Sequence, residues 1–397
     1  MSFVFPTKQL SQLTTEIDYG VTASASDLDT GTKFLRITDI QDGSVEWEKV
    51  PFCDAPKSKL QSASLDDGDI VFARTGATTG KSFLIRSPPD GAVFASYLIR
   101  VKPSSAVDSG YLAHFFQSSG YWKQIKKRTQ GAAQGGVNAT SLSQIEIPLP
   151  TLDEQRRIAA ILDKADALRR KRKRAVALLD SFTRSIFLEM FGDPATNPKK
   201  YTSRTFGSIS TKMSDGPFGS NLKSDHYVEH GVRVIRLQNI GVGKFVDNDK
   251  AFVTKEHFKS LSKHKCLPGD ILVGTLGDPN LRACIQPAWL HEALNKADCV
   301  QIRVDEKIAL PEYIVSLINQ PSVEKLAHGL ILGQTRSRIS MGRLRELAVP
   351  IAPLDEQASF VAAVRKASRI RDGLNRSERA LSQTFTSLQS RAFSGQL

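Results

Sequence analysis

A segment with the character of a long helix occurs twice in this chain, and this repeat constrains the fold more than any other feature. The stretches 147–191 and 349–393 each contain a proline followed four residues later by Leu-Asp-Glu-Gln, and these prolines, Pro148 and Pro350, lie 202 residues apart. The acidic residues of the motif stand where the first turn of a helix favours negative charge. We therefore expect a tandem repeat in which each copy ends in a long helix.

Apolar residues recur at alternating three- and four-residue spacing along both predicted helices, which is typical of a coiled-coil seam. A helix of this length forms a rod of roughly 57 Å. Such a narrow apolar stripe needs a partner, and we expect the two helices to pair antiparallel. The alternative is that each helix packs on its own globular neighbour. The predicted seam consists of Ile158, Ile161, Leu168, Leu179, Phe182 and Ile186 in the first helix and Phe360, Ile370, Leu374, Leu381 and Leu388 in the second.

The segments that precede the two helices repeat one order of elements with little sequence identity. The stretch 33–40 alternates like a strand and matches 233–240, and the turn and strand at 68–71 match those at 268–273. A chain of 397 residues also exceeds what a single core usually supports. We predict an α+β fold with two mixed α/β domains in tandem, each followed by a long helix, with the helices pairing as an antiparallel coiled coil with pseudo-two-fold symmetry.

Charge and cysteine content limit the partners and the compartment. The formal net charge of +13 favours a polyanionic partner. Four cysteines without a CxxC pair suggest neither a zinc site nor a disulfide framework, and they are typical of reduced cytosolic thiols. The sequence shows no signal-peptide pattern and no apolar run of the ~20 residues that a membrane span needs. We expect a cytoplasmic protein that does not interact with membranes.

Motifs for catalysis are incomplete. Gly76-Ala-Thr-Thr-Gly-Lys-Ser82 resembles a phosphate-binding loop, but it is one residue shorter than GxxxxGK[ST]. His226 and His230 are four residues apart, and nothing in the surrounding sequence favours a helix that would bring them together. We therefore expect no catalytic residues and no bound metal.

Binding is the function that the residues favour. Six consecutive cations, Arg169–Arg174, predict either a solvated surface or contact with a partner or with phosphates. Elsewhere, Arg, Lys, Asn and Gln in glycine-containing loops are the side-chain types that read base edges and phosphates, although ordinary polar loops are the alternative. The candidate DNA-binding residues are Arg74, Thr78, Thr79, Lys81, Lys126, Lys127, Arg128, Gln130, Gln134 and Asn138 in the first repeat and Asn221, Lys223, Gln334, Arg336 and Arg338 in the second.

Taken together, these motifs resemble, over the full chain, the specificity subunits of type I restriction–modification systems. The resemblance is carried by the two repeated helix starts, by Met190-Phe-Gly-Asp-Pro194 after the first helix, by Arg74–Lys81 and Asp215–Asn221, and by the terminal Ala392–Leu397. It implies a first target recognition domain at 1–150, a central helix at 151–192, a second recognition domain at 193–352 and a distal helix at 353–397. One departure is that Ala352 stands where the first repeat has Pro150.

The resemblance also implies a mechanism and a set of partners. Each recognition domain would read one half of a bipartite, asymmetric site in double-stranded DNA, while the paired helices set the spacer and dock two modification subunits. Restriction subunits, which carry the motor and nuclease, would join this complex. The chain itself would be non-catalytic and bind no cofactor, with S-adenosylmethionine, ATP and Mg expected on the partner subunits. The alternatives are a coiled-coil adaptor without a DNA role and a fused type II-like restriction–modification component.

Overall fold

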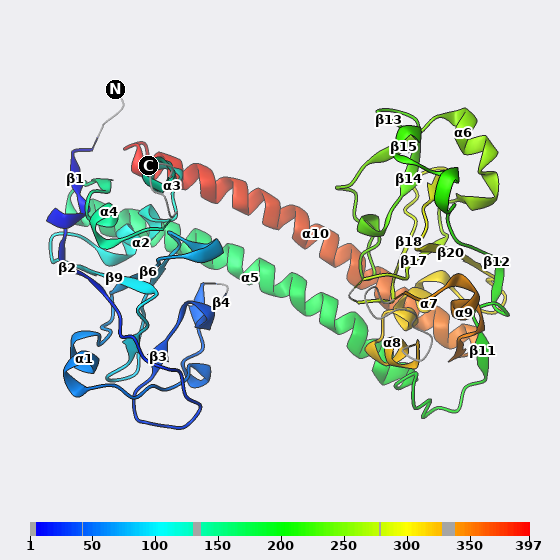
Figure 1. Ribbon diagram of the computed structural model, residues 1–397, viewed down its shortest axis with the longest axis horizontal. Coiled ribbons are helices and arrows are strands. Elements are labelled where there is room, and N and C mark those ends of the chain that lie inside the picture. Colours follow the sequence, from blue (N-terminus) through cyan, green and yellow to red (C-terminus); the bar gives the residue numbers. More distant parts are fainter. Residues whose placement is uncertain (1–4, 42, 130–135, 278, 328–337) are drawn as a thin grey trace. The chain divides into compact units, whose positions relative to one another are not determined.

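The computed structural model of the protein describes residues 5–41, 43–129, 136–277, 279–327 and 338–397. The chain forms two compact units, Met1–Lys173 with Arg376–Leu397 and Arg174–Asn375. Each unit combines a globular domain with part of both long helices, α5 (Leu152–Phe191) and α10 (Leu354–Phe393), which are 40 residues each (Figure 1). The predicted α+β class with tandem domains is confirmed.

The described part of the first unit is centred on a four-stranded antiparallel sheet with the order β2-β9-β6-β7. Helices α2 (Ser109–Phe115) and α3 (Ser119–Thr129) pack on it through aromatic residues, and the rings of Phe72 and Phe116 lie 4.8 Å apart. The sheet strands are β2 (Thr14–Tyr19), β6 (Ile70–Ala73), β7 (Ser82–Leu84) and β9 (Leu98–Pro103). The other elements are β1 (Thr7–Gln9), paired with β10 (Glu146–Pro148), β3 (Phe34–Leu35), paired with β8 (Val93–Phe94), β4 (Ile40–Gln41), paired with β5 (Ser44–Val45), α1 (Lys57–Ser62) and α4 (Ala139–Ser143).

The second unit repeats the same four-stranded order in β12-β20-β17-β18 and, in its described part, adds a five-stranded sheet, β13-β15-β14-β19-β16. The first sheet contains β12 (Ser210–Ser214), β17 (Ile271–Gly274), β18 (Arg282–Ile285) and β20 (Cys299–Val304). The second contains β13 (Tyr227–Val228), β14 (Val232–Ile235), β15 (Ala251–Val253), β16 (Lys265–Cys266) and β19 (Ala293–Asn295). The remaining elements are β11 (Ser203–Thr205), paired with β21 (Ala348–Pro350), α6 (Lys255–Ser260), α7 (Pro311–Ile318), α8 (Pro321–Ala327) and α9 (Met341–Glu346).

A β-bulge occupies the same place in both four-stranded sheets. The register of β2 against β9 shifts between Thr14 and Glu16, and that of β12 against β20 shifts between Ser210 and Lys212. A bulge bends its strand and increases the local twist. The two domains therefore share a sheet geometry that their low sequence identity conceals.

The expectation of a continuous strand over 33–40 is wrong. Strand β3 ends at Leu35, and a 3-10 turn, Ile37–Asp39, follows it. The turn is held by the Asp39 carboxylate, which accepts hydrogen bonds from the backbone N–H and the guanidinium of Arg36 at 2.8–3.1 Å. Alternating apolar residues cannot reveal such a turn, because a side chain three residues away, rather than the apolar pattern, closes it.

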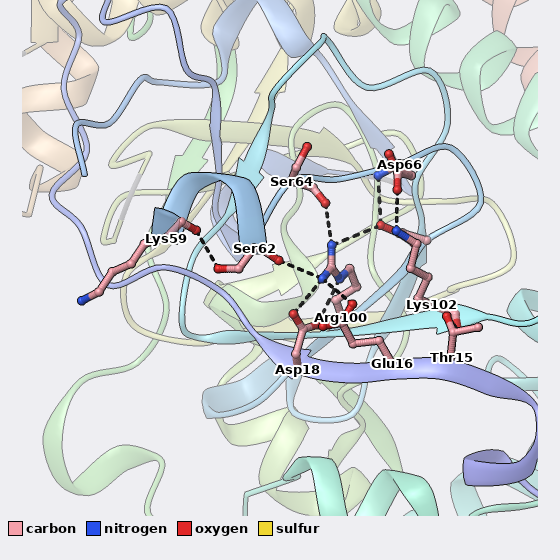
Figure 2. A network of polar contacts seen from close by, with 10 residues as sticks. Thr15, Glu16, Asp18, Lys59, Ser62, Ser64, Asp66, Arg100 and Lys102 are labelled. Atoms are coloured by element: carbon pink, nitrogen blue, oxygen red, sulfur yellow. Dashed lines mark hydrogen bonds and ion pairs between the residues drawn. The ribbon is translucent and has the colours of Figure 1, made fainter. Parts of the chain in front are cut away.

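A buried arginine organises polar contacts at one side of the first sheet (Figure 2). The Arg100 side chain is 3% exposed and pairs with Asp18 at 2.7 Å while donating to the carbonyl oxygens of Ser62 and Ser64. Burial raises the pKa of the Asp18 carboxyl and also that of Asp69, which lies 3.8 Å from the same guanidinium. This network joins strands β2 and β9 to the segment that leads into β6.

In the first unit, the start of α5 packs beside the end of α10. Arg157 donates to the carbonyl oxygen of Leu397 at 2.7 Å, and the Arg169 guanidinium lies 4.9 Å from the Phe385 ring centroid. Residue numbers therefore rise along α5 as they fall along α10, so these segments run antiparallel. Phe393 of α10 also lies 5.3 Å from the ring of Tyr111 in the globular domain.

The second unit contains a matching contact. Phe191, at the end of α5, lies 5.0 Å from the ring of Tyr313 in α7, and Phe187 packs between Tyr313 and Phe360. In each unit, the tyrosine of the globular domain thus receives the final phenylalanine of a long helix. Both helices therefore bury residues against globular domains as well as against each other.

This shared packing changes the buried face of the helices. Leu168, Phe182 and Ile370, which were assigned to the seam, are 53%, 51% and 49% exposed. The deeply buried positions are instead Leu162, Phe187 and Phe385, which the heptad spacing did not select, together with the predicted Ile158 and Phe360. Ile161, Leu179, Ile186, Leu374, Leu381 and Leu388 are partly exposed. A seam derived from helix–helix spacing alone omits the face that a globular domain covers.

In the residues described, no helix has the length and apolar character needed to cross a membrane.

Candidate nucleic-acid interface

The loop that follows β6 is anchored on α3 by its glycine. Gly80 has φ +81°, and a Cβ at this position would lie 3.3 Å from atoms of Trp122 and Ile125. The Tyr121 hydroxyl donates to the Gly80 carbonyl oxygen at 2.7 Å, and burial raises the pKa of this tyrosine. The loop that carries Arg74 and Lys81 is therefore held against α3.

Arg74 lies at the first end of this loop beside exposed aromatic residues. Its guanidinium carbon is 5.0 Å from the ring centroid of Tyr19, an arrangement in which the cation is attracted to the ring face. The backbone N–H of Arg74 donates to the carbonyl oxygen of Tyr97, and the carbonyl oxygen of Arg74 accepts from the N–H of Val137. Tyr19 and Tyr97 are both exposed. This Arg74 cluster, formed by Arg74, the Tyr19 ring beneath it and Tyr97, which it contacts through the backbone, presents a cation and exposed aromatic residues where β6 ends.

The other candidates of the first repeat divide by what their side chains do. Thr79 donates to the carbonyl oxygen of Gly76 at 2.7 Å, and Arg128 donates to that of Gln144 at 2.6 Å. Lys81, Lys126 and Lys127 are exposed and Thr78 is partly exposed. Gln130 and Gln134 lie outside the described residues.

Asn138 has a structural task that the sequence analysis did not foresee. Its side-chain oxygen accepts a hydrogen bond from the N–H of Ser141 at 2.7 Å and so caps α4. The first N–H groups of a helix have no partner within it, and Asn is among the preferred residues for this position. The oxygen is thus engaged in the helix cap, and the predicted base contact of Asn138 stays a prediction.

The second domain presents a comparable arrangement around Arg338. The guanidinium carbon of Arg338 lies 4.8 Å from the ring centroid of Phe218, which is exposed, and Nε lies 2.7 Å from Asp298 Oδ1. Next to it, the N–H of Ile339 donates to the carbonyl oxygen of Thr275 at 3.1 Å. This Arg338 cluster, formed by Arg338, Phe218 and Asp298, therefore sits where the chain returns to the end of β17.

The two clusters lie beside corresponding backbone junctions, although their arginines come from different segments, Arg74 from the end of β6 and Arg338 from the chain that returns to the end of β17. Val137 bonds to Arg74 just after β6, as Ile339 bonds to Thr275 just after β17, and these strands are equivalent in the two sheets. The arginines are among the candidates predicted from the sequence, whereas the rings of Tyr19 and Phe218 are not. In the sequence, each ring is simply an aromatic residue near the end of a strand. That signal is weak as long as the arginine that lies beside the ring is not known.

The remaining candidates of the second repeat lie near Phe218. Asn221 ends a 3-10 turn, Gly219–Asn221, and its carbonyl oxygen is 3.0 Å from Nε2 of His257. Lys223 donates its backbone N–H to Nδ1 of His226 at 3.1 Å. Both candidate side chains are exposed. Gln334 and Arg336 lie outside the described residues.

The chemistry available at these surfaces is that of binding. In the part of the chain that the structure describes, no group of His, Cys, Asp or Glu residues could hold a metal ion. All four cysteines are buried and unpaired, and burial raises the pKa of Cys284 and that of Cys299 to about 12. Cations beside exposed rings suit phosphates and unpaired or exposed base faces.

Each of the two tandem α+β domains carries an arginine beside an exposed ring, and comparison with known proteins relates the chain to DNA specificity domains. Residues 28–177 match the type I restriction modification DNA specificity domain. This part of the chain belongs to that family. The chain is also 23% identical over 388 residues to the type I restriction enzyme EcoKI specificity subunit of Escherichia coli (strain K12), a match that covers 91% of this chain and 82% of that protein.

Solved structures agree on the fold. A chain from a study of complex assembly and conformational transition of the type I R-M system aligns with a TM-score of 0.57 at 16% identity and covers 100% of both chains. The type I restriction-modification system S subunit from M. genitalium aligns with a TM-score of 0.56 at 13% identity over 98% of this chain and 96% of its own.

Proposed function

We propose that this chain is the DNA-reading subunit of a type I restriction–modification complex and that each domain reads one half of a bipartite site. The observation that carries the proposal is that an arginine lies over an exposed ring near the end of the equivalent strands β6 and β17 in both domains. Two equivalent reading surfaces in a single chain suit two separate half-sites. Because the domains differ in sequence, the half-sites would differ, and the full site would be asymmetric.

The partners and cofactors belong to the same proposal. Two methyltransferase subunits dock on the long helices and domains, and restriction subunits with motor and nuclease activity join them. S-adenosylmethionine, ATP and Mg are bound by those subunits rather than by this chain, which is itself non-catalytic and works in the cytoplasm. The +13 net charge adds a sequence-independent attraction to the DNA backbone that weakens as salt rises.

Methylation mapping tests the proposal directly. A host that expresses the chain with its methyltransferase subunit should show methylated adenines in one interrupted motif with two unlike halves. A continuous motif, or no motif that depends on this chain, would refute it. Methyl transfer by the purified chain alone would instead support a fused enzyme, and a complex that binds all sequences equally would support an adaptor.

A further inference from the structure

A basic pocket lies in the first unit between the globular domain and α5. It has a volume of about 410 Å³, and the residues that line it include Lys81, Trp122, Arg169, Arg170, Lys173 and Glu378. Lys81 comes from the loop after β6 and Trp122 from α3. Arg169, Arg170 and Lys173 come from the basic run of α5. The pocket is separate from the Arg74 cluster, which lies at the other end of the same loop.

The pocket sorts the basic run into two groups. Residues 169, 170 and 173 share one face of a helix, since residues three and four apart are neighbours on its surface. These three line the pocket, whereas Lys171 and Arg172 do not. One face of the basic run therefore points into the pocket, and the cations on its other faces are exposed to solvent.

One carboxylate orients two of the guanidinium groups. Asp166 accepts from Arg169 at 2.6 Å through one oxygen and from Arg170 at 2.5 Å through the other. Arg170 also donates to the carbonyl oxygen of Gly43 at 2.9 Å, and Arg169 lies on the ring of Phe385. Groups held in this way lose little further freedom when they bind a ligand.

The balance of charge around the pocket favours an anion. Four cations, Lys81, Arg169, Arg170 and Lys173, are among the lining residues, against one lining carboxylate, that of Glu378, and the Asp166 carboxylate orients the two arginines. Asp166 and Gly43 engage Nε and Nη2 of Arg169 and Nε and Nη1 of Arg170. The remaining guanidinium N–H groups and the Lys81 ammonium can donate to the oxygens of a phosphate. The ligand chemistry is therefore a phosphate group.

We infer that this pocket binds a phosphate of the DNA backbone beside the half-site that the first domain reads, an inference that rests on the proposed function. Lys81 and Arg74 are the two ends of one anchored loop, so DNA bound at the Arg74 cluster would pass close to the pocket. Contacts of this kind set the register of a protein on the duplex and carry no sequence information.

The test compares Lys81→Gln and Lys173→Gln with Arg172→Gln, which changes the same run outside the pocket. Binding of the complex with its methyltransferase subunits to a duplex with the mapped motif is measured from 50 to 200 mM salt. Loss of one phosphate contact lowers the slope of log K against log salt by about 0.9, so the advantage of the wild-type protein should shrink about 3.5-fold over this range. The pocket variants should show this change, keep the methylated motif and retain the wild-type melting temperature, and Arg172→Gln should not change the slope.

A second arm identifies the source of the phosphate. In this arm, a neutral methylphosphonate replaces one backbone phosphate at a time along the duplex. At one position next to the first half-site, the replacement should weaken binding by the wild-type protein. At that same position, it should not weaken binding by Lys173→Gln any further. Unchanged slopes in both pocket variants would overturn the inference, while an intact motif would leave the proposed function standing. Inorganic phosphate that stabilises the wild type but not Lys173→Gln, without an effect on DNA, would reveal a free-anion site and overturn it. Loss of methyltransferase binding alone would assign the pocket to an acidic protein partner and overturn it as well.

Discussion

Gln155 accepts a hydrogen bond from the backbone N–H of Asp108 at 2.9 Å and donates to a carbonyl five residues before it. Gln357 does the same in the second repeat, where it accepts from the N–H of Leu310 at 2.8 Å. Both glutamines are buried. The last residue of the Leu-Asp-Glu-Gln motif therefore fastens the start of each long helix to the domain before it.

Replacing this glutamine should destabilise the protein. Gln155→Ala leaves the N–H of Asp108 and the carbonyl of Pro150 without partners, and unsatisfied buried groups cost about 1–3 kcal/mol each. Urea unfolding of the first unit should show this loss, with Arg156→Ala, an exposed neighbour, within about 0.5 kcal/mol of wild type. Equal stability of the two variants would mean that the clamp contributes nothing.

Arg100→Met should be more damaging, because it leaves the carboxylate of Asp18 and the carbonyls of Ser62 and Ser64 without their donor. Removal of one partner from a buried ion pair typically costs about 3–5 kcal/mol. Lys102→Met is the control, since its pair with Asp66 is exposed and should matter little.

The pH dependence of Arg100→Met follows from the carboxyl groups that it leaves behind. Burial already raises the pKa of Asp18 and Asp69, and loss of the cation should raise both further. A carboxyl whose folded pKa exceeds its unfolded value contributes stability below the unfolded pKa, and this contribution is lost as pH rises through the folded pKa. The deficit of the variant should thus be smaller near pH 4 than at pH 7 in chemical denaturation. A deficit that grows on acidification would contradict this account.

The two arginine clusters should act on separate half-sites. Arg74→Ala should relax recognition in one half of the methylated motif and Arg338→Ala in the other, with about 1–3 kcal/mol of discrimination lost for each base pair that was read. Methylation mapping of both variants checks the assignment. If either change weakened binding to all sequences equally, its arginine would be a backbone contact and not a reader.

The length of the helices should set the spacer. Each long helix contributes to both units, and the units divide near Arg174 in α5 and Asn375 in α10. Seven residues inserted at both places add roughly 10 Å at ~1.5 Å each, about three base pairs at ~3.4 Å per pair. The mapped motif should keep both halves and gain about this spacing. An unchanged spacer would refute the role of the helices as a ruler.

The cysteines should resist alkylation in the folded protein. Burial raises the pKa of Cys284 and of Cys299 to about 12 and also raises those of Cys53 and Cys266, so little thiolate forms at pH 8. Iodoacetamide should modify none of the four at a measurable rate until denaturant is added, when mass spectrometry should find all four modified. Rapid modification of a native cysteine would show that its site opens readily.

The site could be predicted from the sequence only in part, because side-chain type does not reveal a side chain's task. Arg74 and Arg338 lie over exposed rings, whereas Asn138, selected for the same kind of side chain, caps a helix. Tyr19 and Phe218 were not predicted, since each forms part of a candidate binding surface only beside an arginine that is distant in sequence.

The sequence by itself determined the tandem plan, because a 202-residue repeat and an uninterrupted helical pattern are local and need no knowledge of packing. It also determined the basic character of the chain. The tertiary structure alone decided which face of each helix is buried, placing Phe187 and Phe385 inside and Phe182 outside. It likewise turned three cations of a uniform basic run toward one pocket. These outcomes depend on how the domains pack against the helices. Contacts between residues so far apart in the chain produce no periodic pattern in the sequence.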